Sequence, residues 1–150
     1  MSTKWNANKS LLLSRAFVIT AMICCVTAAF FIPTITGWYV TITENTQIRI
    51  PLTVCCYLGL AIALLCILVL FQMLNRISRQ QIFVTENVTS LRIISWCCFG
   101  IGLIFLVPVY WEWGSMLITF IASFFGLIMR VLKNVFQLAV ELREENDYTI

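Results

Sequence analysis

The sequence contains no histidine, and charged residues make up only 11% of its 150 residues. A soluble globular domain usually has about a quarter of its residues charged, so this chain cannot cover itself with a hydrated surface. Hydrophobic residues make up 61% of the chain, and its mean hydropathy is +0.93. The scarcity of charge therefore excludes a soluble globular domain and indicates that lipid surrounds most of the chain.

Four stretches lack charge altogether and are long enough, or nearly so, to cross a bilayer. They have 28, 26, 19 and 17 residues and cover 16–43, 50–75, 93–111 and 113–129. A crossing helix needs about 20 mostly apolar residues, and none of the stretches shows the alternation of a β-barrel strand. The sequence therefore predicts an all-α protein, a four-helix transmembrane bundle that forms a single domain. The expected spans are about 11–32, 51–74, 92–109 and 115–132 of residues 1–150.

Nine of the ten basic residues lie on one side of these spans, and only Arg49 lies on the other. The nine are Lys4, Lys9, Arg15, Arg76, Arg79, Arg92, Arg130, Lys133 and Arg143. Basic residues concentrate in cytoplasmic segments, so this bias predicts cytoplasmic termini and a cytoplasmic loop 76–92. A cleaved signal peptide is the alternative at the N-terminus, but the run 11–32 is too long and lacks a convincing small-x-small site.

The boundaries of the spans follow from proline and from periodicity. The first helix is expected to stop at Pro33, and the outer segment 34–49 alternates polar and apolar residues in a strand-like way. The second helix is expected to begin at Pro51, where a missing N–H costs little. The apolar spacing after residue 128 predicts that the fourth helix continues into the cytoplasm to about Glu145, within a cytoplasmic tail 134–150. The last residues, 146–150, are expected to end the helix and form a short tail.

The four charge-free stretches contain no carboxylate, amine or guanidinium, and this absence bears on function. Proton relays, ion-coupled transporters and intramembrane catalytic sites keep such groups in the bilayer. Metal sites usually mix cysteine with histidine or carboxylates, and general acid–base catalysis needs a paired donor and acceptor. We therefore expect no catalytic residue, no metal and no cofactor, and we expect a protein that is not an enzyme.

Seven cysteines are present, at Cys24–Cys25, Cys55–Cys56, Cys66 and Cys97–Cys98. None forms the Cys-x-x-Cys spacing of redox proteins, and adjacent cysteines on a helix point about 100° apart. Cysteine in lipid behaves as a small apolar residue. Packing is therefore the preferred interpretation, and a membrane thiol oxidoreductase acting through Cys55–Cys56 is an alternative.

Small residues at helical spacing mark expected contacts between helices, because they let backbones approach closely in lipid. They are Gly59 with Ala63, Ala122 with Gly126, and the stripe formed by Ser115, Thr119 and Ser123. The stripe could instead line a polar path in a pore made of several copies. A helix–helix contact is the preferred interpretation.

The polar content outside the spans has two opposite signs. Arg76, Arg79 and Arg92 make the loop 76–92 basic, so it could lie against anionic headgroups. Thr85–Glu86–Asn87 is typical of a helix cap. The tail is acidic, since four acids oppose the single Arg143 between 141 and 147. An acidic amphipathic helix could pair with the loop or bind a basic soluble protein.

Two motifs in these segments resemble a known family. Phe83-Val84-Thr85-Glu86-Asn87-Val88, followed by Leu91-Arg92-Ile93, resembles the loop of YoaS-like proteins, and the ending 141–150 is similar to their C-terminal pattern. These are small bacterial four-span membrane proteins of unknown function. Val84 stands where the pattern has a hydroxyl residue, and Tyr148 stands where it has leucine. The resemblance implies a location in the bacterial cell membrane. It also implies, as partner, a helix-turn-helix regulator encoded beside the membrane protein.

We therefore expect a membrane-anchored regulatory or scaffold protein that binds a cytoplasmic partner, with the lipid bilayer around it and no direct contact with nucleic acid. The expected partner-binding residues are Phe83, Thr85, Glu86, Asn87, Arg92, Glu141, Glu144, Glu145, Asn146 and Asp147. The alternatives are a homo-oligomeric transport, pore-like or immunity component, and the thiol oxidoreductase.

Overall fold

Four long helices make up most of the computed structural model, which describes residues 2–148 and the side chains of 9–146. The helices are α1 (Ser2–Thr43), α2 (Arg49–Ser78), α3 (Thr85–Leu106) and α4 (Gly114–Tyr148). Two short 3-10 helices, η1 (Thr46–Ile48) and η2 (Val107–Tyr110), precede α2 and follow α3. All four long helices are long and apolar enough to cross a membrane, and the described residues contain no strand. The expected all-α, four-span architecture is confirmed.

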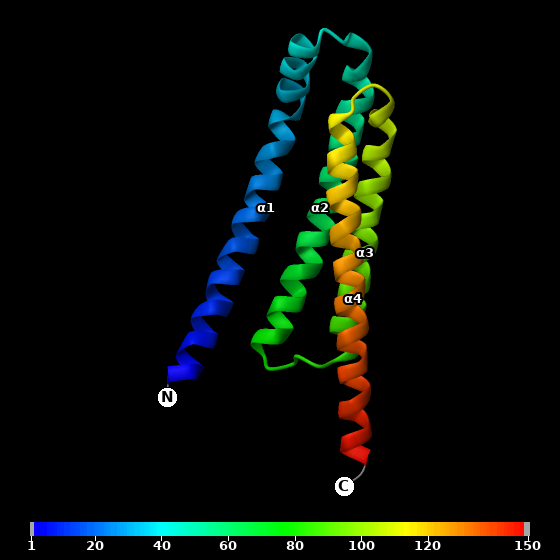
Figure 1. The fold of residues 1–150 in the computed structure, drawn as a ribbon. Coiled ribbons are helices and arrows are strands. Elements are labelled where there is room, and N and C mark those ends of the chain that lie inside the picture. Colours follow the sequence, from blue (N-terminus) through cyan, green and yellow to red (C-terminus); the bar gives the residue numbers. More distant parts are fainter. Residues whose placement is uncertain (1, 149–150) are drawn as a thin grey trace.

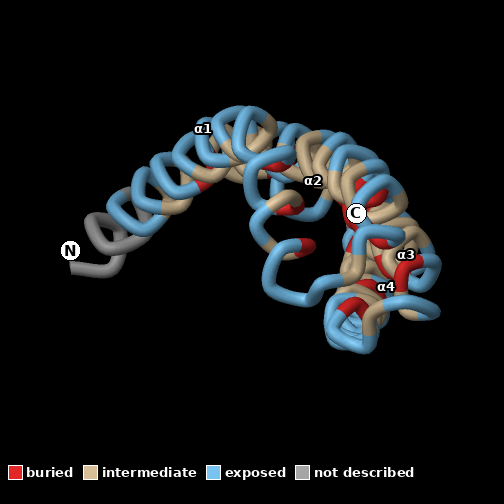
Figure 2. The backbone as a smooth tube through the Cα atoms, turned by 90° about the horizontal axis from the view of Figure 1, so that it is seen from above, coloured by how far each residue is buried: buried red, intermediate tan, exposed pale blue. Residues whose placement is uncertain are grey.

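The helices pack in chain order, α1 on α2, α2 on α3 and α3 most extensively on α4. Figure 2 shows that they form an open, curved row, and Figure 1 shows α1 leaning away from the others toward its N-terminal end. The start of α1, the end of α4 and the α2–α3 link lie at one end of the molecule. We call this end, which carries Arg76, Arg79, Arg92 and Arg143, the basic end.

The expectation that the first helix stops at Pro33 is wrong, because α1 continues to Thr43. Proline has no N–H, so the carbonyl of Ala29, four residues earlier, loses its helical donor. The hydroxyl of Tyr57 on α2 donates to that carbonyl at 3.2 Å. The Thr36 hydroxyl donates to the carbonyl of Ile32 at 2.9 Å. Side-chain hydrogen bonds are thus present on both sides of Pro33, where α1 continues without ending.

The strand-like interpretation of the outer segment is also wrong, since residues up to Thr43 are helical and Thr46–Ile48 form η1. The hydroxyls of Thr41 and Thr43 donate to the carbonyls of Gly37 and Tyr39, four residues earlier, at 3.0 Å each. Such bonds hold threonine hydroxyls within a helix. The alternation of polar and apolar residues therefore lies within a helix end and does not mark a strand.

The loop expected at 76–92 is shorter in the structure, because only residues 79–84 separate α2 from α3. At the end of α2 the N–H of Gln80 donates to the carbonyl of Ile77 and the N–H of Gln81 to that of Arg76, at 3.0 and 3.1 Å. This is the Schellman pattern, which ends many helices with a left-handed residue. Gln80 supplies that conformation, with φ of 65°.

Side-chain hydrogen bonds also join α1 to α2 at the basic end. The guanidinium of Arg15 on α1 donates to the amide oxygen of Asn75, and to the hydroxyl of Ser78 at 2.9 Å. Both acceptors lie in the last turn of α2, where the helix dipole favours a cation. Arg15 therefore fastens α1 to α2 near the point where the two helices diverge.

Candidate functional site

Asn87 is the structural centre of the α2–α3 link. Its side chain is fully buried, and its amide nitrogen donates to the carbonyls of Gln81 and Ile82 at 2.9 and 2.8 Å. The N-cap position of α3 is Val84, which makes no side-chain capping bond. The cap expected from Thr85–Glu86–Asn87 is thus replaced by the Asn87 amide, which holds the link from inside the first turn of α3.

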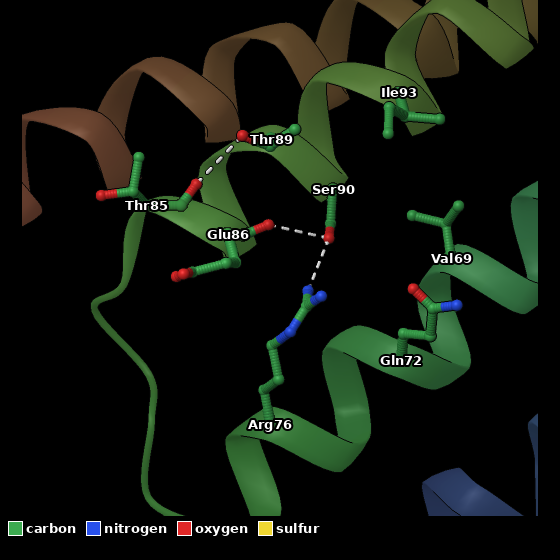
Figure 3. Close-up of a pocket in the computed structure, with 8 residues that line it drawn as sticks. All are labelled: Val69, Gln72, Arg76, Thr85, Glu86, Thr89, Ser90 and Ile93. Carbon is green, nitrogen blue, oxygen red and sulfur yellow. Dashed lines mark hydrogen bonds between the residues drawn. The ribbon is translucent and has the colours of Figure 1, made fainter.

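Thr85 and Glu86 line a pocket of about 260 Å³ between α2 and α3. Figure 3 shows Arg76 reaching across from α2, where its guanidinium donates to the hydroxyl of Ser90 at 3.0 Å. The Ser90 hydroxyl in turn donates to the backbone carbonyl of Glu86 at 2.9 Å. Thr85 and Glu86, both exposed, therefore lie at the edge of the pocket between α2 and α3.

Phe83 lies on the other side of the link and contacts α4. Its ring centroid is 6.0 Å from that of Phe136, and its carbonyl accepts a hydrogen bond of 3.5 Å from the guanidinium of Arg143. The structure therefore joins the link to α4, sixty residues further along the chain.

The C-terminal part of α4 presents exposed acids. Glu141, Glu144, Glu145 and Asn146 are exposed, and the Glu141 carboxylate accepts a hydrogen bond of 3.0 Å from the Gln137 amide. Asp147 belongs to α4, but its side chain lies outside the described residues, as do residues 149–150. The predicted continuation of the fourth helix is confirmed and extends to Tyr148.

Arg92 lies between α3 and α4, apart from the other predicted partner-binding residues. It lines a pocket of about 240 Å³ together with Ser95, Trp96, Arg130 and Lys133. The guanidinium carbon of Arg130 is 5.7 Å from the centroid of the Trp96 ring, a distance typical of a cation–π contact. Arg130 and Lys133 were expected only to set the topology. Their register with Ser123 and Gly126 was the signal that could have placed them against α3.

The small residues lie where helices approach closely. A Cβ on Gly59 would be 2.8 Å from the Phe105 ring, and one on Gly126 would be 3.2 Å from the Phe99 ring. Ala63 and Ala122 are half-buried.

The stripe on α4 faces α3. Ser115 is buried, and the Ser123 hydroxyl lies 2.8 Å from where a Cβ on Gly102 would be. The hydroxyl of Thr119 is buried without a hydrogen-bond partner in the structure. The stripe therefore lies within the α3–α4 contact.

All seven cysteines are free thiols. The thiol of Cys55 is buried and donates to the carbonyl of Ile104 on α3 at 3.6 Å. No group of three potential metal ligands occurs among the described residues.

Comparison with known proteins gives one match. The model of the family described as "Protein of unknown function (DUF2975)" matches residues 38–150, which include α2, α3, α4 and both motifs. No curated protein and no solved structure matches the chain. The match agrees with the expectation of an uncharacterised family, but it does not confirm the YoaS-like name.

Proposed function

The chain belongs to the DUF2975 family of proteins of unknown function, and from that premise we propose that it is a multi-pass membrane scaffold that binds a soluble protein at its basic end. The observation that supports this is the contact between Phe83 and α4, through the Phe136 ring and the Arg143 guanidinium. It joins the α2–α3 link to the C-terminal part of α4, so that both segments are available to one binding surface. We call this surface, formed by Phe83, Glu141, Glu144 and Glu145, the docking face.

The charge of the docking face suggests the kind of partner. Its three glutamates are exposed, and Phe83, 43% exposed, adds an apolar side chain on the α2–α3 link. A basic protein with a small apolar contact would complement this combination, since complementary potentials steer association. DNA-binding regulators are basic on their DNA-binding face, and the resemblance described above points to a helix-turn-helix protein. We propose a cytoplasmic regulator of that kind, bound to a protein of the bacterial cell membrane.

Co-purification tests the proposal. The intact chain, extracted in mild detergent, is compared with a Glu141→Lys/Glu144→Lys/Glu145→Lys variant. We expect the wild type to retain a basic soluble protein and the variant to lose it. Glu44→Lys, an exposed charge reversal between α1 and η1 at the opposite end of the molecule, is the control and should retain it. Equal retention by all three proteins would remove the docking face from the proposal.

The two alternatives have weaker structural support. A pore lined by Ser115, Thr119 and Ser123 needs that stripe to face water, yet it packs on α3 around Gly102. A thiol oxidoreductase predicts disulfide exchange at Cys55 and Cys56. Unchanged disulfide-exchange activity after Cys55→Ala/Cys56→Ala would dismiss it.

A further inference from the structure

The face of α4 that contacts α3 changes character along its length. This face carries Ser115, Thr119, Ser123 and Gly126. The same three- and four-residue spacing continues toward the basic end with Arg130 and Lys133. The hydroxyl of Ser95 on α3 donates to the carbonyl of Gly126 at 2.9 Å, where the two helices still touch. One turn further on, the close contact gives way to the pocket of about 240 Å³.

This pocket is strongly basic. Arg92 of α3 and Arg130 and Lys133 of α4 account for three of its five lining residues, and none of the five is acidic. No ion pair joins these three cations to a carboxylate within the described residues, whereas Arg130 stacks on Trp96. Like charges close together repel, so an anion bound among these three cations would relieve their repulsion.

The pocket lies at the level where phospholipid phosphates are found. Arg92 directly precedes the charge-free stretch 93–111, and Arg130 directly follows the stretch 113–129. Trp96 is 62% exposed, as an amphipathic ring at the membrane interface would be in the absence of lipid. We propose that the pocket binds the phosphate of an anionic phospholipid, with the Arg92 and Arg130 guanidiniums and the Lys133 ammonium as its donors.

Phosphate geometry suits this set of donors. A guanidinium can donate two parallel hydrogen bonds to phosphate oxygens, and an ammonium adds a compact charge. Exposed apolar side chains continue above the pocket on the spans, among them Leu127 and Leu103. Acyl chains attached to the phosphate would cover such side chains, and free phosphate would not. This favours a lipid over a soluble phosphate compound.

The site is independent of the docking face, so the two proposals can fail separately. To test it, the purified protein in neutral detergent is titrated with short-chain phosphatidylglycerol, phosphatidylcholine or inorganic phosphate, and the midpoint of thermal unfolding is followed. We expect phosphatidylglycerol to raise the midpoint and phosphatidylcholine to leave it unchanged. A comparable rise with inorganic phosphate would overturn the lipid assignment and leave a simple anion site.

Variants locate the binding. A cation near the membrane surface contributes about 1 kcal/mol to binding of anionic lipid, so Arg130→Gln should weaken the apparent affinity about fivefold and Arg130→Gln/Lys133→Gln about 25-fold. Arg79→Gln is the control, because Arg79 is exposed at the same end but does not line the pocket. An equal loss in Arg79→Gln would show nonspecific attraction and overturn the proposal.

Two further measurements test the phospholipid site if the neutral variants do not fold. The charge-conserving pair Arg130→Lys/Lys133→Arg should keep most of the response. Native mass spectrometry of the wild type, released from an equal mixture of phosphatidylglycerol and phosphatidylcholine, should show phosphatidylglycerol retained. Retention of the two lipids in equal amounts would contradict a specific site.

Discussion

The hydroxyl of Tyr57 donates to the carbonyl of Ala29, the acceptor that Pro33 leaves without a helical donor. Proline in a helix interior normally kinks or breaks the helix. Here the replacement donor comes from α2, so the continuity of α1 depends on its neighbour. A local sequence pattern around Pro33 holds no information about that donor.

A double-mutant cycle tests this relationship. Tyr57→Phe removes the donor and should lower the free energy of unfolding by about 1 kcal/mol, the usual net value of a hydrogen bond. With Pro33→Ala present, the N–H of residue 33 can serve Ala29, and the same change should cost much less. Unfolding in a titration of denaturing detergent measures both values. An equal cost in the two backgrounds would separate Tyr57 from the proline.

Gln80→Gly should stabilise the protein. Gln80 has φ of 65°, and a left-handed conformation costs an ordinary residue about 1 kcal/mol that glycine does not incur. Gln80→Ala is the control, because alanine keeps the steric cost and should give no gain. The free energy of unfolding of the three proteins is the measurement, and a gain for alanine equal to that for glycine would contradict the explanation.

Gly59→Ala should destabilise the α2–α3 contact by about 1 kcal/mol or more, the lower range of overpacking effects. The new Cβ would lie 2.8 Å from the Phe105 ring, which has to move. Gly100→Ala is a matched control in α3, since its Cβ would lie 3.6 Å from the Ile62 side chain, an ordinary contact. Thermal unfolding in one detergent compares the two variants. A larger loss in Gly100→Ala would refute this packing argument.

Asn87→Ala should loosen the α2–α3 link. The change removes the two part-buried hydrogen bonds to Gln81 and Ile82, which should cost about 1–3 kcal/mol. Hydrogen exchange and protease cleavage within 79–84 should accelerate, while α4 stays protected. Thr89→Ala, which removes only an exposed bond to the Thr85 carbonyl at 3.2 Å, should leave both rates near those of the wild type.

The topology expected from the basic residues can be measured with single cysteines in a cysteine-free background. Gln80→Cys lies on the α2–α3 link and Gln47→Cys on η1, at the opposite end. In intact cells, a membrane-impermeant maleimide should label Gln47→Cys and spare Gln80→Cys until the membrane is opened. Labelling of Gln80→Cys in intact cells would reverse the orientation.

The sequence predicted the four spans and the long fourth helix, because the absence of charge and the three- and four-residue spacing are local properties. It could not predict the passage of α1 through Pro33, which involves Tyr57 on another helix. The prediction of a single loop over 76–92 also did not distinguish the contacts of its residues. The structure divides that segment: Phe83 contacts α4, Glu86 lines the α2–α3 pocket, and Arg92 lines the α3–α4 pocket. Which side of a short link meets which helix is a tertiary property.

The length of α4 determines how far its C-terminal end can extend beyond the hydrocarbon core of the membrane. Its 35 residues rise about 52 Å at 1.5 Å per residue, and the hydrocarbon core takes up about 30 Å of that. About 20 Å of straight helix is left to hold the docking face beyond the hydrocarbon. A regulator bound there would stand beside an anionic lipid surface, which repels the phosphates of DNA. Confinement next to the membrane would then oppose DNA binding even if the partner's DNA-binding residues stayed uncovered.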